Sequence, residues 1–377
     1  MSEIKLTHIN SYYITSRLHG ELVSMLDKKG LKQHVFVPVQ KTAHLNKNMP
    51  EKLKHGEIYY THCFSTFHRY LWPLKMMRTW KAFKKHYAKH STELIHAHSL
   101  IVNGLIAYRA HKKWKLPYIV SIRSTDMHIF MQKSFIFRNI GYRILKNASA
   151  IMFLSPAYLD IQLKAILGDQ IYRELKPKSH IIPNGINDYW LNNRKSKERA
   201  NNQRTVIFVG IINKRKNLQA IINACEILNK QSFNIRLMVA GDGPLLSDLK
   251  KQKHLTPVSY YGHISDPEKL RDLYREADLL AVPSLIETFG LIYPEAMSQG
   301  LPVIYSKNQG FDGHFPEGYV GFTVNPHDAN EIASKIKMIY SYYARLSNNA
   351  YEASLTFSWE MVAEKLINLY SSIKKVN

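Results

Sequence analysis

Cysteine is scarce in this 377-residue sequence, which contains only Cys63 and Cys225. Two isolated cysteines exclude a disulfide framework and a cysteine-rich metal cluster, and we interpret both as core residues of a protein from a reducing compartment. The sequence also lacks the roughly 18 consecutive apolar residues that a membrane-spanning helix needs. Its first ten residues contain no basic stretch leading into a long apolar run, as a secretory signal would. These absences predict a cytoplasmic protein.

Acidic residues are few as well, since 29 Asp and Glu stand against 52 Lys and Arg, and the net charge is +23. The excess is uneven. Residues 1–180 carry 29 Lys and Arg against 10 Asp and Glu, a charge of +19, and the remaining residues supply only +4. Such a field attracts an anionic partner, which can be a nucleic acid, an acidic membrane leaflet or a phosphorylated substrate. Charge alone does not choose among the three.

The order of hydrophobic segments predicts an α/β protein. Through residues 1–184, short β-branched or aromatic runs (LTHI, HVFV, LIHA, YIVSI and AIMFL) alternate with helical patterns, and such alternation builds a parallel sheet covered by helices. We expect one helix from about Ser11 and another from Pro156. The polar stretch NNRKSKERANNQ then marks a domain boundary, so residues 185–203 are the predicted linker.

The alternation restarts at RTVIFVG and predicts a second doubly wound domain over residues 204–355, with strands in NIRLMVAG, PVSYYG, ADLLAV and PVIYS. The last segment, residues 356–377, is amphipathic at helical spacing, and we expect it to pack back on the first domain. Open parallel sheets bind ligands at the C-terminal ends of their strands. We therefore predict two Rossmann-like domains that face each other across a cleft, with the active site between them.

The stretch PSLIETFGLIYPEAMSQGLPVI is the most informative one for chemistry. Glu287 precedes a glycine-containing turn, and Glu295 follows after seven intervening residues on a predicted helix that begins near Gly290. Free backbone amides of Phe289, Gly290 and Leu291 at this helix start suit a phosphate or sugar hydroxyls. Glu295, one turn after Leu291, can accept two hydrogen bonds from a ribose diol. The alternative is a pair of surface glutamates beside a helix cap.

A second element, FVGIINKRKN, combines a strand end with a basic cluster. The strand ends at Gly210, and Lys214, Arg215 and Lys216 lead into the next helix. Fixed cations and amide dipoles stabilise the charge that develops on a diphosphate leaving group without requiring a metal ion. Taken alone, three consecutive basic residues are more often part of a solvated loop.

In sequence order, IPNGI, FVG followed by KRKN, VAGDGP, YYGHI, ADLLAVPSLIETFGLIYPEAMSQGLPVI and VGFTVNP resemble the retaining glycosyltransferases of family 4, also called group 1. The resemblance runs through most of the chain and is densest over residues 181–325. It implies the GT-B arrangement of two Rossmann-like domains. It also implies transfer of a sugar, with retention, from a nucleotide diphosphate sugar, UDP in preference to GDP, to a hydroxyl of a glycan acceptor.

The resemblance implies roles for the matching residues. Lys216 and a nearby arginine bind the donor diphosphate, and Glu287 lies near the donor sugar in the catalytic position. Residues 289–291 supply backbone amides, and Glu295 binds the ribose. Each role agrees with the chemistry of the residue types and their spacing.

The sequence departs from the family pattern in three places. Many members carry an arginine directly after the glycine of the first strand, where this chain has Ile211, so Arg215 is the candidate substitute. In VSIRSTDMH, many members have a histidine before the aspartate, whereas this chain has Arg123 with Asp126, as in a capsular or cell-surface polysaccharide subgroup. Arg123 is a candidate to bind an acceptor phosphate or the donor. NSYY at residues 10–13 replaces a glycine pair of the family.

Histidines that follow strands are candidate proton carriers. His98 follows LIHA, and we group it with Arg123 and Asp126 as candidates for the acceptor site or the cleft. His96 and His128 are further candidates, but a lone histidine is more often structural than functional. No general base is assigned, because the departing phosphate can itself take the acceptor proton.

No metal or other cofactor is predicted, and the donor is a substrate. The sequence shows neither a helix-spaced histidine pair with a glutamate nor an Asp-x-Asp element between strands. We expect the basic cluster to replace a divalent ion at the diphosphate.

Residues 70–89, YLWPLKMMRTWKAFKKHYAK, combine an aromatic stripe with many lysines. This pattern suits an anionic membrane surface, although a stripe that packs on the sheet, with solvated lysines, is the favoured alternative. The charge still predicts a peripheral protein at the inner face of the cell membrane, with a lipid-linked or lipopolysaccharide acceptor. Two other functions stay open: a basic nucleic-acid-binding protein, for which no binding module is recognised, and a nucleotide-sugar epimerase on the same fold.

Overall fold

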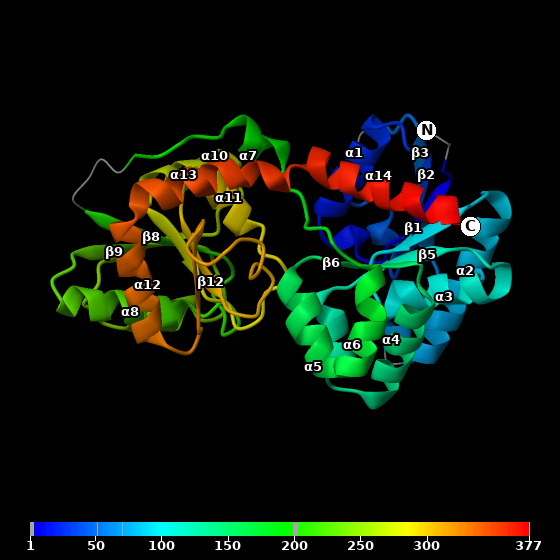
Figure 1. Cartoon of the computed structure of the whole chain (residues 1–377), viewed down its shortest axis with the longest axis horizontal. Helices are drawn as coiled ribbons and strands as arrows, with labels where there is room; N and C mark the ends of the chain where they lie inside the picture. The colour runs from blue at the N-terminus through cyan, green and yellow to red at the C-terminus, as the bar shows by residue number, and fades with distance from the viewer. Residues whose placement is uncertain (1–3, 51, 70, 199–202, 377) are drawn as a thin grey trace. The chain divides into compact units, whose positions relative to one another are not determined.

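The computed structural model describes residues 4–50, 52–69, 71–198 and 203–376, and it divides into two compact units (Figure 1). Unit 1 consists of Met1–Leu154, Leu159–Gly185 and Trp359–Asn377, and unit 2 of Ser155–Tyr158 and Ile186–Ser358. The predicted linker is not a separate segment in the structure. Its residues 186–198 belong to unit 2, and its residues 199–202 lie outside the described part of the chain.

Unit 1 is built on a seven-stranded sheet with the order β3-β2-β1-β4-β5-β6-β7, and the strand pairs described are all parallel. The strands are β1 (Leu6–Ile9), β2 (Gln33–Val39), β3 (Gly56–His62), β4 (Leu94–Ala97), β5 (Tyr118–Ser121), β6 (Ala150–Phe153) and β7 (Ser179–Ile181). The α-helices are α1 (Leu18–Lys28), α2 (Trp72–Lys89), α3 (Val102–Trp114), α4 (Phe135–Asn147), α5 (Lys164–Leu167), α6 (Asp169–Leu175) and α14 (Trp359–Val376).

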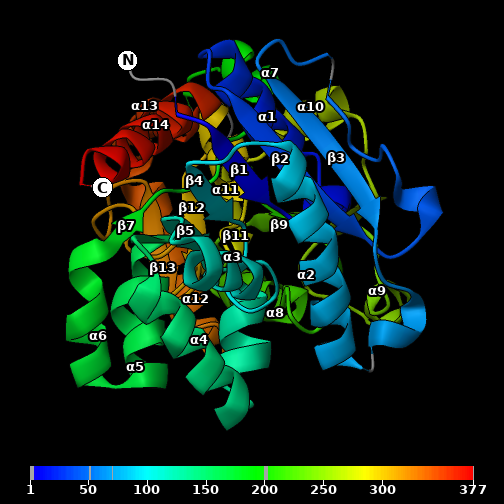
Figure 2. The same cartoon turned by 90° about the vertical axis from the view of Figure 1, so that its right-hand side faces the viewer.

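Helices cover both faces of this sheet (Figure 2). Successive strand residues point to opposite faces. Ile119 of β5 joins a buried cluster with α1 and α14, whereas Val120 faces Gly104 of α3, where an added Cβ would lie 3.2 Å from it. The last helix, α14, belongs to the core of unit 1, because Trp359, Val362, Ala363, Leu366, Leu369, Tyr370 and Ile373 are buried in this cluster at helical spacing.

Three local features of unit 1 differ from the sequence-based expectation. The edge strand β3 was not predicted, because most of its residues are only half-buried and its sequence lacks a clear apolar face. The helix expected from about Ser11 begins at Leu18, after a single 3-10 turn at Tyr13–Thr15. The helix expected from Pro156 does begin there, but it continues as a π-helical turn, Tyr158–Leu163, before α5 and α6.

The aromatic stripe of α2 packs inside unit 1, as the favoured alternative predicted. Met76 and Phe83 are fully buried, and Trp80 and Tyr87 lie against Trp114 of α3. Trp72, the first residue of the stripe, packs against Phe137 of α4. Arg78, Lys81, Lys85 and Lys89 are exposed. None of the described helices is long and apolar enough to cross a membrane.

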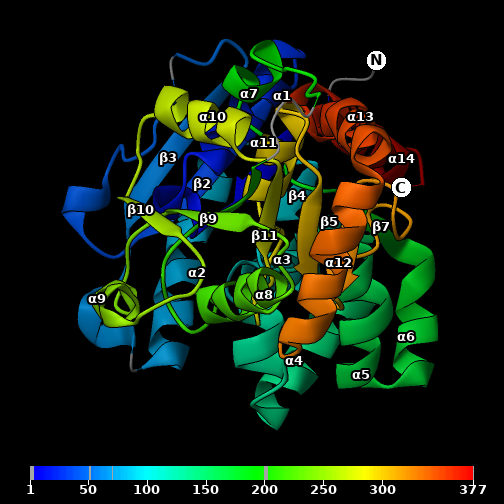
Figure 3. The same cartoon turned by 90° about the vertical axis from the view of Figure 1, so that its left-hand side faces the viewer.

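Unit 2 repeats the plan, and Figure 3 shows its strands together with the helices that cover them. Its six-stranded parallel sheet has the order β10-β9-β8-β11-β12-β13 for the residues described. The strands are β8 (Arg204–Val209), β9 (Ile235–Ala240), β10 (Val258–Gly262), β11 (Leu279–Val282), β12 (Val303–Ser306) and β13 (Gly321–Val324). The α-helices are α7 (Asp188–Asn192), α8 (Leu218–Lys230), α9 (Leu246–Lys251), α10 (Pro267–Glu276), α11 (Ile292–Ser298), α12 (Ala329–Ser341) and α13 (Tyr343–Ala353). Two Rossmann-like parallel sheets confirm the predicted fold class.

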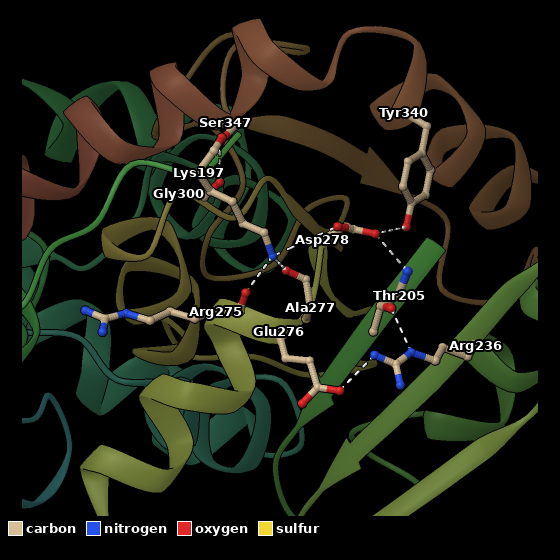
Figure 4. Close-up of polar contacts among 10 residues, drawn as sticks. All are labelled: Lys197, Thr205, Arg236, Arg275, Glu276, Ala277, Asp278, Gly300, Tyr340 and Ser347. Atoms are coloured by element: carbon tan, nitrogen blue, oxygen red, sulfur yellow. Dashed lines mark hydrogen bonds and ion pairs between the residues drawn. The ribbon is translucent and has the colours of Figure 1, made fainter. Parts of the chain in front are cut away.

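A network of buried polar groups fastens the segment before β8 to unit 2 (Figure 4). Lys197 Nζ donates to the carbonyl oxygens of Arg275 and Ala277 and lies 4.0 Å from Asp278 Oδ1. The other oxygen of Asp278 accepts hydrogen bonds from Thr205 N at 2.9 Å and Tyr340 Oη at 3.1 Å. Asp278 therefore offsets the charge of a half-buried lysine and satisfies a backbone amide at the start of β8.

We expect Asp278→Ala to lower the free energy of unfolding by about 3 kcal/mol, because it removes the counter-charge of the half-buried Lys197 and leaves the buried Thr205 amide without its acceptor. Urea-induced unfolding measures this change. Asp272→Ala is the matched control, since Asp272 pairs with Arg271 at the surface and its loss leaves no buried group unpaired. Equal destabilisation by the two substitutions would contradict the role assigned to Asp278.

Candidate active site

An ion pair lies at the C-terminal edge of the unit 2 sheet. Lys216 Nζ is 2.5 Å from Glu287 Oε2, and the two side chains are only 11% and 9% exposed. Lys216 follows β8 and Glu287 follows β11, and these strands are paired in parallel. Residues 71 positions apart in the sequence are thus brought together at one edge of the sheet.

Further hydrogen bonds hold Glu287 in place. Its Oε2 accepts from Ser284 Oγ at 3.2 Å, and its Oε1 accepts from the Thr288 amide at 3.1 Å. The Glu287 amide donates to Gln309 Oε1 at 3.0 Å, and its carbonyl oxygen accepts from Tyr158 Oη at 2.8 Å. Charge-assisted hydrogen bonds of this kind offset the cost of burying a carboxylate. Both the side chain and the backbone of Glu287 are therefore fixed.

These supporting residues were not found in the sequence. Ser284 and Gln309 are polar residues of ordinary type, although Asn-Gln-Gly after PVIYS is a sequence typical of a turn. Gly310 in that turn passes so close to residues 288 and 289 that an added Cβ would lie 2.2 Å from the Thr288 carbonyl carbon. The turn thus packs directly against the segment that carries Glu287, and this close contact leaves no room for a side chain at position 310.

The glycine turn after Glu287 has the geometry expected for amide donors. Gly290 has φ +82°, and an added Cβ would lie 2.4 Å from the Tyr293 ring. Among the described residues, the backbone amides of Phe289, Gly290 and Leu291 donate no hydrogen bond. The Phe289 side chain is itself buried among aromatic rings, so only its backbone is available to a ligand.

Glu295 lies one turn beyond this segment, on α11. Its amide donates to the Leu291 carbonyl oxygen at 3.1 Å, which places the two residues on one helical face. The Glu295 side chain is half-buried. The predicted relation between the glycine turn and the second carboxylate is therefore present in the structure.

The basic segment meets the same site. Gly210 ends the strand with φ +147°, and the aliphatic part of Lys216 lies over it, 3.6 Å from the position of an added Cβ. Arg215 is exposed and lies next to the loop that carries Glu287. Its backbone carbonyl oxygen accepts from Leu285 N at 2.8 Å, and its Nη1 is 3.5 Å from the Ile286 carbonyl oxygen. Unit 2 thus combines cations, unpaired amides and two carboxylates, an arrangement suited to an anionic ligand with hydroxyl groups.

The three candidates of unit 1 lie together at the ends of β4 and β5. Arg123 Nε donates to the His98 carbonyl oxygen at 3.2 Å. Asp126 is fully buried and accepts from the amides of Arg123, Leu100 and Ile101 at 2.9 to 3.0 Å. Asp126 therefore ties the two loops together. Burial raises the pKa of Asp126, against the lowering effect of these amides and of Arg123.

The environment of His98 keeps it neutral. Burial, together with the neighbouring histidines and Arg123, lowers the pKa of His98 well below its ordinary value. Burial also lowers the pKa of Arg123 to about 10, so the guanidinium stays charged at neutral pH. Since the Arg123 side chain is only partly buried, it is the group of this cluster best able to meet an anionic ligand.

His8, His96 and His98 form a buried group whose nitrogen atoms come close enough together to hold a metal ion. Most of these atoms already have partners, however. His8 bonds to His98 at 2.9 Å and to Gln33 at 3.1 Å, and His96 bonds to Tyr370 and Ser121 at 2.8 and 2.7 Å. We therefore interpret this group as a hydrogen-bonded core network. His128, another candidate from the sequence, is not part of this group, and its Nδ1 bonds to Gln132 Oε1 at 3.3 Å.

Residues 18–163 match the family described as glycosyl transferase 4-like domain, and residues 191–353 match glycosyl transferases group 1. An uncharacterised glycosyltransferase of Methanocaldococcus jannaschii is 26% identical over 304 residues, which are 74% of this chain and 75% of that protein.

Solved structures of low sequence identity share the fold. Sucrose-phosphate synthase of Thermosynechococcus elongatus superposes with a TM-score of 0.75 at 20% identity, over 99% of this chain and 100% of the other. The Anabaena protein HepE, in complex with UDP-glucose, gives a TM-score of 0.67 at 16% identity, over 98% and 100% of the two chains. The family matches on both units and the fold together show that this chain belongs to the group 1 glycosyltransferases and has their GT-B type of Rossmann-like domains.

Proposed function

We propose that this protein transfers a sugar from a nucleotide diphosphate sugar, UDP in preference to GDP, to a hydroxyl of a glycan acceptor, with retention and without a metal. The observation that carries the proposal is the Lys216–Glu287 pair beside the unpaired amides of residues 289–291. It supplies positive charge and hydrogen-bond donors where a diphosphate needs them, next to a fixed carboxylate. The preference for UDP draws support from HepE, which was solved with UDP-glucose.

In this proposal the donor diphosphate binds Lys216 and Arg215 and accepts hydrogen bonds from the amides of residues 289–291. Glu295 accepts hydrogen bonds from the ribose diol, as its half-buried position one turn along α11 allows. Glu287 lies beside the transferred sugar. Its bonds to Ser284 and the Thr288 amide keep the carboxylate in position when the phosphate shares Lys216.

The proposed chemistry depends on stabilising the leaving group. When the bond between the anomeric carbon and the phosphate oxygen breaks, negative charge grows on the diphosphate, and the fixed cations and amides favour this state over the ground state. The acceptor hydroxyl attacks the anomeric carbon, and the departing phosphate oxygen takes its proton. Arg123, still charged and partly exposed, is the proposed contact for an acceptor phosphate.

Calorimetric titration with UDP, UDP-glucose and GDP tests the donor site. We expect the wild type to bind the uridine compounds more tightly than GDP. We expect Glu295→Ala and Lys216→Met each to weaken binding at least tenfold, because each removes a charged hydrogen-bond partner worth about 1.5–3 kcal/mol. Glu268→Ala and Lys250→Met, at exposed positions of unit 2, are the matched controls and should bind as the wild type does. Wild-type affinity in both site variants would overturn the assignment.

Retention and independence of metal are tested by the product. With an acceptor in hand, NMR of the new glycosidic bond should show the anomeric configuration of the donor sugar. The rate should be unchanged by EDTA, because Lys216, Arg215 and the amides do the work of a divalent ion. A product with inverted configuration would refute retention. Inhibition of the reaction by EDTA that Mg²⁺ or Mn²⁺ reverses would refute independence of metal.

We also propose that the acceptor is lipid-linked or a lipopolysaccharide and that unit 1 binds the anionic inner face of the cell membrane. The support is the charge of +19 over residues 1–180 and the exposed side chains of Lys81, Lys85 and Lys89 along α2. Basic residues near an acidic leaflet each add about 1 kcal/mol to binding. Because the aromatic stripe of α2 packs inside unit 1, the proposed attraction to the membrane is electrostatic.

Co-sedimentation with vesicles that contain phosphatidylserine tests the membrane proposal. Reversing charge at Lys81, Lys85 and Lys89 to Glu should lower binding at least tenfold. The same reversal at Lys250, Lys251 and Lys253 of unit 2 is the control and should change it less. Binding should fall steeply as salt is raised. A wild-type protein that stays in the supernatant at low salt, and accepts no lipid-linked glycan as substrate, would rule the proposal out.

A further inference from the structure

A second histidine cluster lies at the edge of the unit 1 sheet and shares no residue with the network of His8, His96 and His98. It consists of His34 on β2, Glu57 and Tyr59 on β3, and His86 and His90 at the end of α2. One ligand atom each from His34, Glu57 and His90 can be chosen so that all lie within 4.8 Å of one another. β2, β3 and α2 lie side by side here (Figure 2).

The backbone explains why these side chains meet. His34 and Glu57 are direct partners in the parallel register of β2 and β3, so both project from the same face of the sheet, toward α2. His86 and His90 are four residues apart, and the His90 amide donates to the His86 carbonyl oxygen at 3.2 Å. They therefore share one helical face. The ring centroid of His90 lies 4.9 Å from that of His34 and 4.8 Å from that of His86.

Some of these imidazoles lack the partners that buried polar groups normally have. His34 Nδ1 and His86 Nε2 are buried and have no hydrogen-bond partner among the described residues. A buried nitrogen without a partner is costly, and such a group in a native fold calls for an explanation. His8 and His96, in the core network, use both ring nitrogens in hydrogen bonds. In the core network His98 Nδ1 alone lacks a partner among the described residues, whereas the edge cluster has two such nitrogens on two different rings.

The cluster is also reachable from solvent. His34 and Glu57 line a surface pocket of 680 Å³, and His86 and His90 line another of 770 Å³. Tyr59 borders both pockets. An ion can therefore reach the site, and water can occupy a coordination position that the protein leaves open.

We propose that His34, Glu57 and His90 bind a divalent transition-metal ion, Zn²⁺ above all, with His86 beside the site as a further nitrogen donor. Two imidazoles and one carboxylate, with a fourth position open, form a set that Zn²⁺ accepts in tetrahedral geometry. Ca²⁺ and Mg²⁺ prefer oxygen ligands only, so this set discriminates against them. The ion joins the edge strand β3 to β2 and to the end of α2.

This site is separate from the proposed donor chemistry. It lies in unit 1, and none of its ligands belongs to the residues proposed to bind the diphosphate. It departs from the expectation that the chain has no metal site. The sequence pattern did not reveal it, because the carboxylate comes from a strand 29 residues before His86 rather than from the same helix.

Full-length protein without a histidine tag, stripped with EDTA and dialysed, tests the proposal by calorimetric titration with ZnCl₂. We expect one saturable equivalent, and Co²⁺ in its place should give the intense visible absorption of a four-coordinate ion. Glu57→Gln and His90→Gln should each weaken Zn²⁺ binding at least tenfold. Glu57 is exposed, so its substitution leaves the fold intact even if that of His90 does not.

His62→Gln is the control, because His62 is an exposed histidine of the same strand that bonds to the Gln40 carbonyl oxygen. It should bind Zn²⁺ as the wild type does, and Zn²⁺ should raise the unfolding temperature of both but not of Glu57→Gln. Absence of saturable binding in the wild type would overturn the proposal. So would binding that Glu57→Gln and His90→Gln leave unchanged.

Discussion

Parallel pairing of β8 with β11 is the constraint on which the site in unit 2 depends. Leu279 and Leu280 stand beside Val206 and Ile207, so both strands end at the same edge. The segments that follow them then meet, and Leu285 N bonds to the Arg215 carbonyl oxygen. β12, paired with β11, brings the turn with Gln309 to the same edge. Three loops that are remote in sequence thus build one site, because all strands of a parallel sheet end at the same edge.

The second constraint is electrostatic. Glu287 and Lys216 are both nearly buried, and either charge alone would be costly in that position. Together they offset each other, and Ser284 and the Thr288 amide satisfy the remaining lone pairs of the carboxylate. In the proposed donor complex, the diphosphate adds negative charge beside Lys216 and shares this lysine with Glu287. Binding of the anion is then coupled to the electrostatic environment of the Glu287 carboxylate.

Much of this arrangement was predictable from the sequence, and the rest was not, for physical reasons. Buried parallel strands such as β8 and β11 are continuous apolar runs and were recognised, whereas the half-exposed edge strand β3 carries no such pattern. Gly290 and the basic residues pointed to the site because special backbone geometry and charge are local signals. The contacts of Ser284 and Gln309 with Glu287 depend on tertiary packing, so residue type alone gave no sign of them.

The histidines of unit 1 show the same limit of prediction from sequence. In the sequence His98 stood out because it follows a strand, yet the structure places it in a network where His8 and His96 have both ring nitrogens bonded. His34 and His90 carried no comparable signal. They come together only because β2 and β3 pair in register and α2 ends above them. The chemical capacity of a histidine is set by which of its lone pairs the fold leaves unused, and that depends on neighbours distant in sequence.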